Sequence, residues 1–112
     1  MDRIVEIAGQ SMTLRANALL PRKYRHAFGR DLIADMKDLH DTYTKSGGQT
    51  FDAEVFENLT WLMLRESGEN VGANPEEWLA GIDDPMGLYL ILSDVVDLWA
   101  SSLQTTAKPK KK

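Results

Sequence analysis

The sequence contains no cysteine, which excludes disulfide bonds, thiol nucleophiles and cysteine-bound zinc. It also lacks a long apolar run, since the longest stretch, residues 88–92, is far shorter than the roughly 20 residues that span a membrane. Asp2 and Glu6 stand where a secretory signal peptide would need apolar residues. The sequence therefore predicts a soluble, unprocessed protein that does not associate with membranes.

Catalytic motifs are equally scarce. The two histidines, His26 and His40, would lie about 20 Å apart on a single helix and could not share a metal ion. Neither belongs to a zinc-protease motif, and the sequence has neither a phosphate-binding glycine-rich loop nor a GxSxG serine motif. We therefore expect no catalytic residue, no bound metal and no cofactor.

Three aspartates recur at helical spacing: Asp31, Asp35 and Asp38. They share a helix face that could hold a cation or a general acid and base pair. Calcium sites, however, usually come from loops in which several oxygens converge, and the sequence shows no such loop. The favoured interpretation is a solvated helix face.

The chain has 112 residues, of which 43% are apolar, enough for one hydrophobic core. We expect a single domain over residues 1–104. Residues 105–112 carry four lysines and no apolar side chain larger than alanine, so burial cannot offset their ordering entropy. The sequence predicts a disordered basic tail there.

Charge is unevenly distributed about the net value of −4. Residues 1–30 contain six basic and two acidic side chains, whereas residues 31–104 contain three basic and fifteen acidic ones. An acidic body repels polyanions, so nucleic acid is not the expected partner.

Residues 3–16 have the alternating pattern of a β-hairpin, with a turn at Gly9 and Gln10. An isolated hairpin is only marginally stable in water. It must therefore lie on the helices or pair with another chain, and its outer edge is a candidate interaction surface.

The rest of the chain predicts a mainly α fold, a small bundle of about four helices preceded by the hairpin. The first helix should run from Pro21 to about Lys45, where Gly47 and Gly48 end it. Its apolar stripe consists of Tyr24, Phe28, Leu32, Ile33, Met36, Leu39 and Tyr43.

Capping signals mark three further helices. Thr50 or Asp52 should begin the second helix, which ends at Gly68, and Asn74 should begin a short third helix. Asp84 and Pro85 should begin a fourth helix over residues 85–103. This helix is apolar on more than one side, so we expect it to be the central core helix.

A basic run opens the first predicted helix: Arg22, Lys23, Arg25, His26 and Arg30. Clustered arginines bind carboxylate or phosphate. The acids of the protein itself, Asp31 and Asp35 first among them, are the favoured partners, followed by another protein and then by nucleic acid.

Among the three tryptophans, Trp78 and Trp99 sit among leucines and are predicted core residues. Trp61 falls off the apolar stripe of its helix, so it lies either at a rim or interface, where tryptophan is enriched, or under the hairpin. The candidate partner-binding residues are therefore Arg22, Arg25, Arg30 and Trp61.

The segment YRHAFGRDL, residues 24–32, resembles the YRxxFGxD signature of small tail assembly chaperones encoded by phages and prophages of Gram-positive bacteria. The matching residues are Tyr24, Arg25, Phe28, Gly29 and Asp31. Later aromatic segments are similar in order as far as Gln104. We interpret Tyr24 and Phe28 as packing residues, and Gly29, inside a helix, as a point of close approach by another element.

The resemblance implies a non-enzymatic assembly factor of a long-tailed phage, present in the host cytoplasm and not in the mature virion. Such chaperones are thought to coat the tape measure protein, a long helical polypeptide, and to give way to tail tube subunits. The resemblance also makes self-association an expectation, and a longer frameshifted form would depend on the codons of Lys110–Lys112.

Other function classes remain as alternatives. The acidic stretch over residues 31–104 would suit a small regulator that mimics DNA and inhibits a nucleic-acid enzyme. A helix-turn-helix protein that binds DNA through residues 22–30 is a third hypothesis. An enzyme ranks last, because no nucleophile, base or metal ligands converge.

Overall fold

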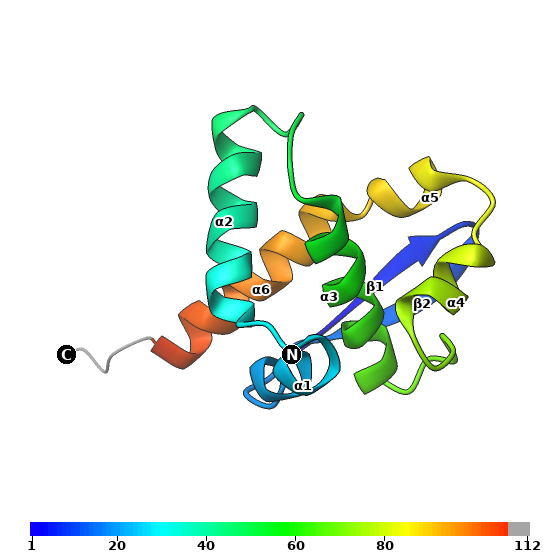
Figure 1. The fold of residues 1–112 in the computed structure, drawn as a ribbon, viewed down its shortest axis with the longest axis horizontal. Helices are drawn as coiled ribbons and strands as arrows, with labels where there is room; N and C mark the ends of the chain where they lie inside the picture. Colours follow the sequence, from blue (N-terminus) through cyan, green and yellow to red (C-terminus); the bar gives the residue numbers. More distant parts are fainter. Residues whose placement is uncertain (108–112) are drawn as a thin grey trace.

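The computed structural model describes residues 1–107, with side chains described as far as Ser101. An antiparallel hairpin precedes a set of helices (Figure 1), which confirms the predicted fold class. The last helix continues to Ala107, so residues 105–107 are helical although the sequence predicted a disordered tail there. The rest of the predicted tail, residues 108–112, lies outside the described residues.

Residues 1–107 form six helices: α1 (Leu20–Phe28), α2 (Leu32–Lys45), α3 (Ala53–Glu66), α4 (Pro75–Ala80), α5 (Pro85–Tyr89) and α6 (Leu92–Ala107). Each predicted helix is present, but the first and the last are both broken in two. The predicted caps Asp52, Asn74 and Asp84 are confirmed, since each side chain accepts a backbone N–H in the following first turn. None of the helices in this part of the chain is both long and apolar enough to cross a membrane.

The hairpin pairs β1 (Asp2–Ile7) with β2 (Gln10–Arg15). Ala8 and Gly9 form its two-residue turn and have φ angles of 52° and 84°. Positive φ at both positions matches the twist of the flanking strands. The alternating pattern therefore predicted this element correctly, with the turn one residue earlier than expected.

The two faces of the hairpin have different environments. The inner face buries Val5, Ile7 and Leu14, because α3 lies against β2 and α6 against β1. Side chains alternate between the faces of a strand, and Ile4, on the outer face, is 72% exposed. The hairpin thus lies on the helices, as predicted.

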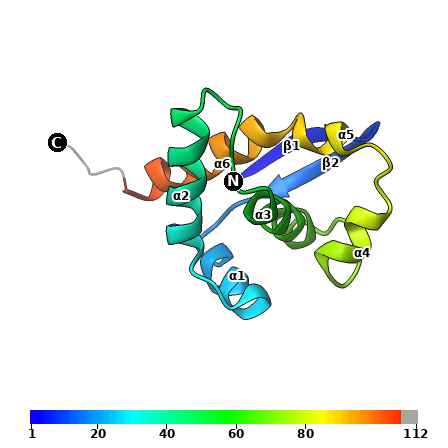
Figure 2. The ribbon, with the colours of Figure 1, turned by 45° about the horizontal axis from the view of Figure 1, so that its top comes forward.

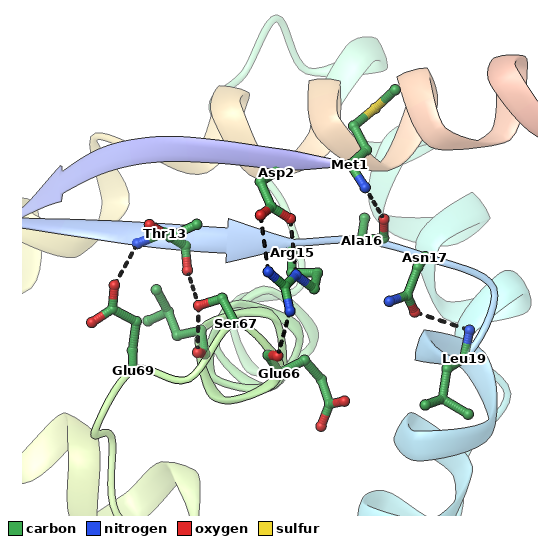
Figure 3. Close-up of polar contacts among 11 residues, drawn as sticks. Met1, Asp2, Thr13, Arg15, Ala16, Asn17, Leu19, Glu66, Ser67 and Glu69 are labelled. Carbon is green, nitrogen blue, oxygen red and sulfur yellow. Dashed lines mark hydrogen bonds and ion pairs between the residues drawn. The ribbon is translucent and has the colours of Figure 1, made fainter.

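The outer edge of β2 is covered by the end of α3 and the loop after it (Figure 3). The Thr13 N–H donates to Glu69 Oε2 at 2.8 Å, and Ser67 Oγ donates to the Thr13 carbonyl at 2.6 Å. Arg15 Nη1 also donates to the Glu66 carbonyl at 3.3 Å. The two bonds at Thr13 satisfy backbone groups of β2 that would otherwise attract another strand.

The first predicted helix breaks at Gly29, which ends α1 in the left-handed conformation with φ 68°. Asp31 then caps α2, where its carboxylate accepts the Ile33 N–H at 3.0 Å. Our expectation that Gly29 lies inside a helix against another element is wrong, because a Cβ at this position would meet no atom within 4 Å. Glycine is favoured there by its backbone conformation and not by close packing.

Replacing Gly29 with alanine should lower the free energy of unfolding by about 1 kcal/mol, because side chains with a Cβ are strained in the left-handed region. Gly81 is the matched control, since it ends α4 with an ordinary φ of −88°. Gly81→Ala should change stability by less than about 0.5 kcal/mol. Urea unfolding measures both variants, and equal losses would contradict the conformational explanation.

The predicted fourth helix is divided at Leu90, which is 73% exposed. At this turn the Ile91 N–H donates to the Leu88 carbonyl at 3.2 Å, three residues back. The turn allows α5 and α6 to pack against different parts of the hairpin. Gly87 of α5 lies against the hairpin turn, where an added Cβ would be 3.6 Å from the Ala8 Cα, while α6 packs along β1.

The most central helix is α3, which Figure 2 shows nearly end-on, with β2, α1, α2 and α4 around it. Its buried residues are Val55, Phe56, Leu59, Thr60, Trp61, Leu62, Met63 and Leu64. The prediction that the fourth helix would be central is wrong, because α6 packs on one side of the molecule, against β1 and α3. Contacts on several sides of α3 explain why its buried surface includes Trp61, which falls off the apolar stripe expected from the sequence.

Candidate functional site

The four residues proposed from the sequence for partner binding do not form one site. Arg30 contacts α2, Trp61 is buried within α3, and Arg22 and Arg25 are exposed on α1. Arg22 and Arg25 are three residues apart and so lie about 60° from each other around the α1 axis. The structure instead divides the candidate surface into several regions.

Arg30 belongs to a partly buried polar network at the junction of α1 and α2. Its Nε and Nη2 atoms donate to the Asp35 carboxylate at 2.7 and 2.8 Å, and the Tyr24 hydroxyl donates to Asp35 Oδ2 at 2.8 Å. The hydrogen bonds from Arg30 hold the pKa of Asp35 below its usual range despite burial. Burial, together with the bond to Asp35, raises the pKa of Tyr24.

This network corrects one prediction and confirms another. Asp35 is only 7% exposed, so a solvated face is the wrong description for it, although Asp38 is exposed. The preference for an intramolecular acid as the partner of the basic run is confirmed at Arg30. The break at Gly29 also places His26 and His40 on separate helices, so their predicted separation along one helix does not apply.

Trp61 is 2% exposed, so the rim position is wrong. Its indole N–H donates to the Val71 carbonyl at 3.1 Å, and its ring meets Phe28 edge-on, with centroids 6.0 Å apart. The Arg65 guanidinium lies over the Trp61 ring, 5.2 Å from its centroid. A role for Trp61 in partner binding stays a prediction, with only a small part of the ring accessible.

The other predicted packing residues largely have that role. Tyr24 and Trp99 are buried at 0% and 8% exposure. Phe28 and Trp78 are half-buried against the core, and the Tyr24 and Phe28 rings meet edge-on at 5.0 Å. Their positions confirm the core assignment of Trp99 and make Trp78 a residue of the core margin.

A hollow of about 300 Å³ is lined by α1 on one side and α3 on the other; we call it the α1–α3 pocket. Its lining residues are Lys23, His26, Ala27, Trp61, Leu62, Arg65 and Glu66. Lys23 Nζ lies 3.8 Å from Glu66 Oε2, a distance that indicates a weak exposed ion pair. This pocket contains the part of the predicted basic surface that the fold gathers together.

An apolar groove of about 370 Å³ lies between α2 and α6; we call it the α2–α6 groove. Its lining residues are Ile33, Met36, Lys37, His40, Asp41, Val96, Trp99 and Ala100. Ile33, assigned from the sequence to the apolar stripe, is 58% exposed at the groove wall. The groove has no signature in the sequence, because its two walls are some sixty residues apart in the chain.

The edge of β1 is the third region. Met1 and Ala16 exchange two backbone hydrogen bonds of 3.0 and 2.9 Å, and the bonded pairs alternate from there along an antiparallel ladder. Asp2, Ile4 and Glu6 therefore direct their backbone groups away from β2. The helix α6 also packs on β1. A role of this edge in pairing with a strand of another chain stays a prediction.

No group of three or more acidic or histidine side chains in the described part of the chain is placed to hold a metal ion. The hollows that bear on the predicted partner surface are the apolar α2–α6 groove and the basic α1–α3 pocket. The chain matches no protein-family model, no curated protein and no solved structure.

Proposed function

We propose that the protein is a non-enzymatic tail assembly chaperone of a long-tailed phage, which binds the tape measure protein in the host cytoplasm. Two independent observations support the proposal. The residues Tyr24, Arg25, Phe28, Gly29 and Asp31 match the signature of that family, and the α2–α6 groove presents an apolar surface to solvent.

The groove is the observation that carries the proposal. Helix-in-groove recognition needs an apolar channel between two helices that accepts side chains at helical spacing. The α2–α6 groove is an apolar hollow between two helices, and its floor is made by Met36, Val96 and Trp99, which are 1%, 6% and 8% exposed. Because these three side chains are held by the core, the floor of the groove keeps its shape without a partner. The small contact area of the groove suits a chaperone that must later be displaced from its partner.

Co-expression tests the proposal. A cognate tape measure protein should be more soluble with this chain than without it, and the two should co-purify. If the tape measure protein is equally insoluble in both cases and no complex is recovered, the proposed function is wrong. Tail tube protein added to the complex should release the chaperone.

Ile33→Asp should weaken the complex with the tape measure protein about tenfold or more, because it places a carboxylate on the apolar wall of the groove. The folded state should tolerate the change, since Ile33 is 58% exposed and an acid in the first turn of a helix is favourable. Ile4→Asp is the matched control, because Ile4 is also exposed but lies outside the groove. If Ile33→Asp binds as tightly as the parent protein, or no more weakly than Ile4→Asp, the groove is not the binding surface.

The DNA-mimic alternative keeps one supporting observation, the exposed acids around α4 and α5. They are Glu76, Glu77, Asp83 and Asp84. A DNA mimic should lose its partner steeply as salt rises, whereas apolar groove binding should not. The salt dependence of the purified complex separates the two functions.

A further inference from the structure

The basic face of α1 has few acidic partners in the fold. Arg30 is paired with Asp35, but Lys23 has only the 3.8 Å contact with Glu66. Among the described residues, Arg22 has no ion pair within 4.0 Å, and Arg65 lies over the Trp61 ring instead of beside a carboxylate. An acidic protein thus keeps several positive charges together beside one pocket.

The positive charges stand on both walls of the α1–α3 pocket. The Lys23 ammonium lines it from α1, next to the His26 ring, and the Arg65 guanidinium lines it from α3. Arg22 precedes His26 by one helical turn and extends the same row. Arg25, in contrast, is two residues from both Lys23 and Ala27, and therefore lies about 160° from each of them around the helix axis, away from the pocket.

The pocket lining is mixed, and Trp61 and Leu62 make an apolar floor within it. Trp61 and Leu62 are 2% and 3% exposed, so they present only a small fixed surface at the bottom, and Ala27 is exposed beside them. A ligand that fits would place an apolar side chain on this floor and negative groups against the two basic walls. That pattern is found in protein segments with an apolar residue between acidic ones.

We infer that the α1–α3 pocket binds an acidic segment of a partner protein, with one apolar side chain against Ala27 and the accessible parts of Trp61 and Leu62, and with carboxylates facing Lys23 and Arg65. Charge complementarity selects this occupant. Nucleic acid is disfavoured because residues 31–104 carry fifteen acidic and three basic side chains, which repel a long polyanion. The inference goes beyond the proposed function, because it concerns a different surface from the α2–α6 groove.

Glu66 acts as an internal competitor in this site. Its carboxylate lies at the pocket, 3.8 Å from Lys23 Nζ, and a carboxylate of the bound segment would take the same partner. Removing its charge should therefore strengthen binding. If the acidic segment were attracted to a basic surface far from Glu66 instead, removing this charge would have little effect on binding. The Glu66 variant therefore tests whether the segment binds in this pocket.

The test uses the whole protein and a short fluorescein-labelled peptide, Glu-Glu-Leu-Glu-Glu with neutral ends, followed by fluorescence anisotropy. We expect a dissociation constant of roughly 100 μM or below at low salt. Binding should weaken about tenfold between about 0.01 M and about 0.15 M salt, where the Debye length falls from roughly 30 Å to roughly 8 Å. The same peptide with glycine in place of leucine should bind several times more weakly, and a lysine-for-glutamate version should not bind.

Variants of matched charge locate the site. Lys23→Glu and Arg65→Glu should each weaken peptide binding about tenfold, whereas Arg25→Glu, which changes the charge of α1 equally, should change it less than about twofold. Glu66→Gln should tighten binding about threefold. Circular dichroism of each variant, compared with the parent protein, shows whether the fold is kept, and Glu66→Gln tests the site even if a reversal variant fails to fold.

Several results would overturn the inference. They are an absence of peptide binding, an equal loss in Arg25→Glu and Lys23→Glu, and unchanged or weaker binding in Glu66→Gln. Equally tight binding of a single-stranded oligothymidylate would assign the pocket to nucleic acid. Sedimentation showing a self-associated protein that Lys23→Glu dissociates would assign it to a second copy of the chain. None of these results bears on the tape measure complex, so the two proposals fail separately.

Discussion

Asp35→Ala should destabilise the protein by about 2–3 kcal/mol, because it removes the acceptor that organises the junction of α1 and α2. The Tyr24 hydroxyl, on a side chain with 0% exposure, would lose its 2.8 Å bond to Asp35. A buried donor without a partner costs about 1–3 kcal/mol, and breaking a buried ion pair adds to that cost. The Arg30 side chain is 57% exposed, so water can solvate its guanidinium once Asp35 is removed. This solvation limits the total loss of stability.

Urea unfolding measures this effect against Asp38→Ala. Asp38 lies on the same helix but is exposed, so its removal should change stability by less than about 0.5 kcal/mol. Adding Tyr24→Phe to Asp35→Ala removes the unpaired hydroxyl and should recover about 1 kcal/mol. A loss below about 1 kcal/mol in Asp35→Ala would show that the network contributes little.

The same network makes stability depend on pH. Because the folded pKa of Asp35 is lowered from an unfolded value of about 3.9, the unfolded chain binds the proton more readily. The contribution of Asp35 is therefore present above about pH 4 and is lost as pH falls through the folded pKa. The difference in unfolding free energy between the parent protein and Asp35→Ala should accordingly shrink between about pH 6 and about pH 2.

Phe56→Ala should have the larger effect, a loss of about 3–5 kcal/mol, because it opens a cavity at the centre of the core. Phe56 has 0% exposure on α3, and its ring meets Phe51 at 6.0 Å and Tyr89 at 5.8 Å. These aromatic contacts hold the start of α3 against α5, so their loss adds to the transfer free energy. Against a typical total stability of about 5–15 kcal/mol, the variant would be marginally folded.

Thermal and urea unfolding check this prediction, with Leu90→Ala as the control. Leu90 is 73% exposed, so Leu90→Ala should lower the free energy of unfolding by less than about 0.5 kcal/mol. Tyr89, whose hydroxyl donates to Glu57 Oε2 at 2.9 Å, offers a local probe through its absorbance. A loss below about 2 kcal/mol for Phe56→Ala would contradict the central place of α3 in the core.

Local signals predicted the elements well. The alternation of apolar and polar residues predicted the hairpin. The helix starts were predicted by Asp52, Asn74 and Asp84, because a cap interacts with backbone N–H groups only two or three residues away. The two missed breaks had weaker signals. Gly29 followed by Asp31 is a helix end followed by a cap, yet the apolar periodicity ran through both and favoured one long helix.

The candidate site was less predictable than the fold. From the sequence, Arg22, Arg25 and Arg30 formed one basic run, but the fold sends Arg30 to Asp35 and turns Arg25 away from the α1–α3 pocket. Arg65, which completes that pocket, lies far along the chain and carried no local signal. The side chains of neighbouring residues on a helix diverge, so nearness in sequence does not imply a shared surface.

The sequence by itself determined the mainly helical class, the hairpin, most caps and the separation of basic and acidic segments, since all of these depend on composition or on residues within a turn of one another. Only the tertiary structure decided that Asp35 and Trp61 are buried, that α3 is central, and that α2 meets α6 around an open apolar groove. Burial depends on which faces of distant elements meet, and that choice is made by the packing of the whole core.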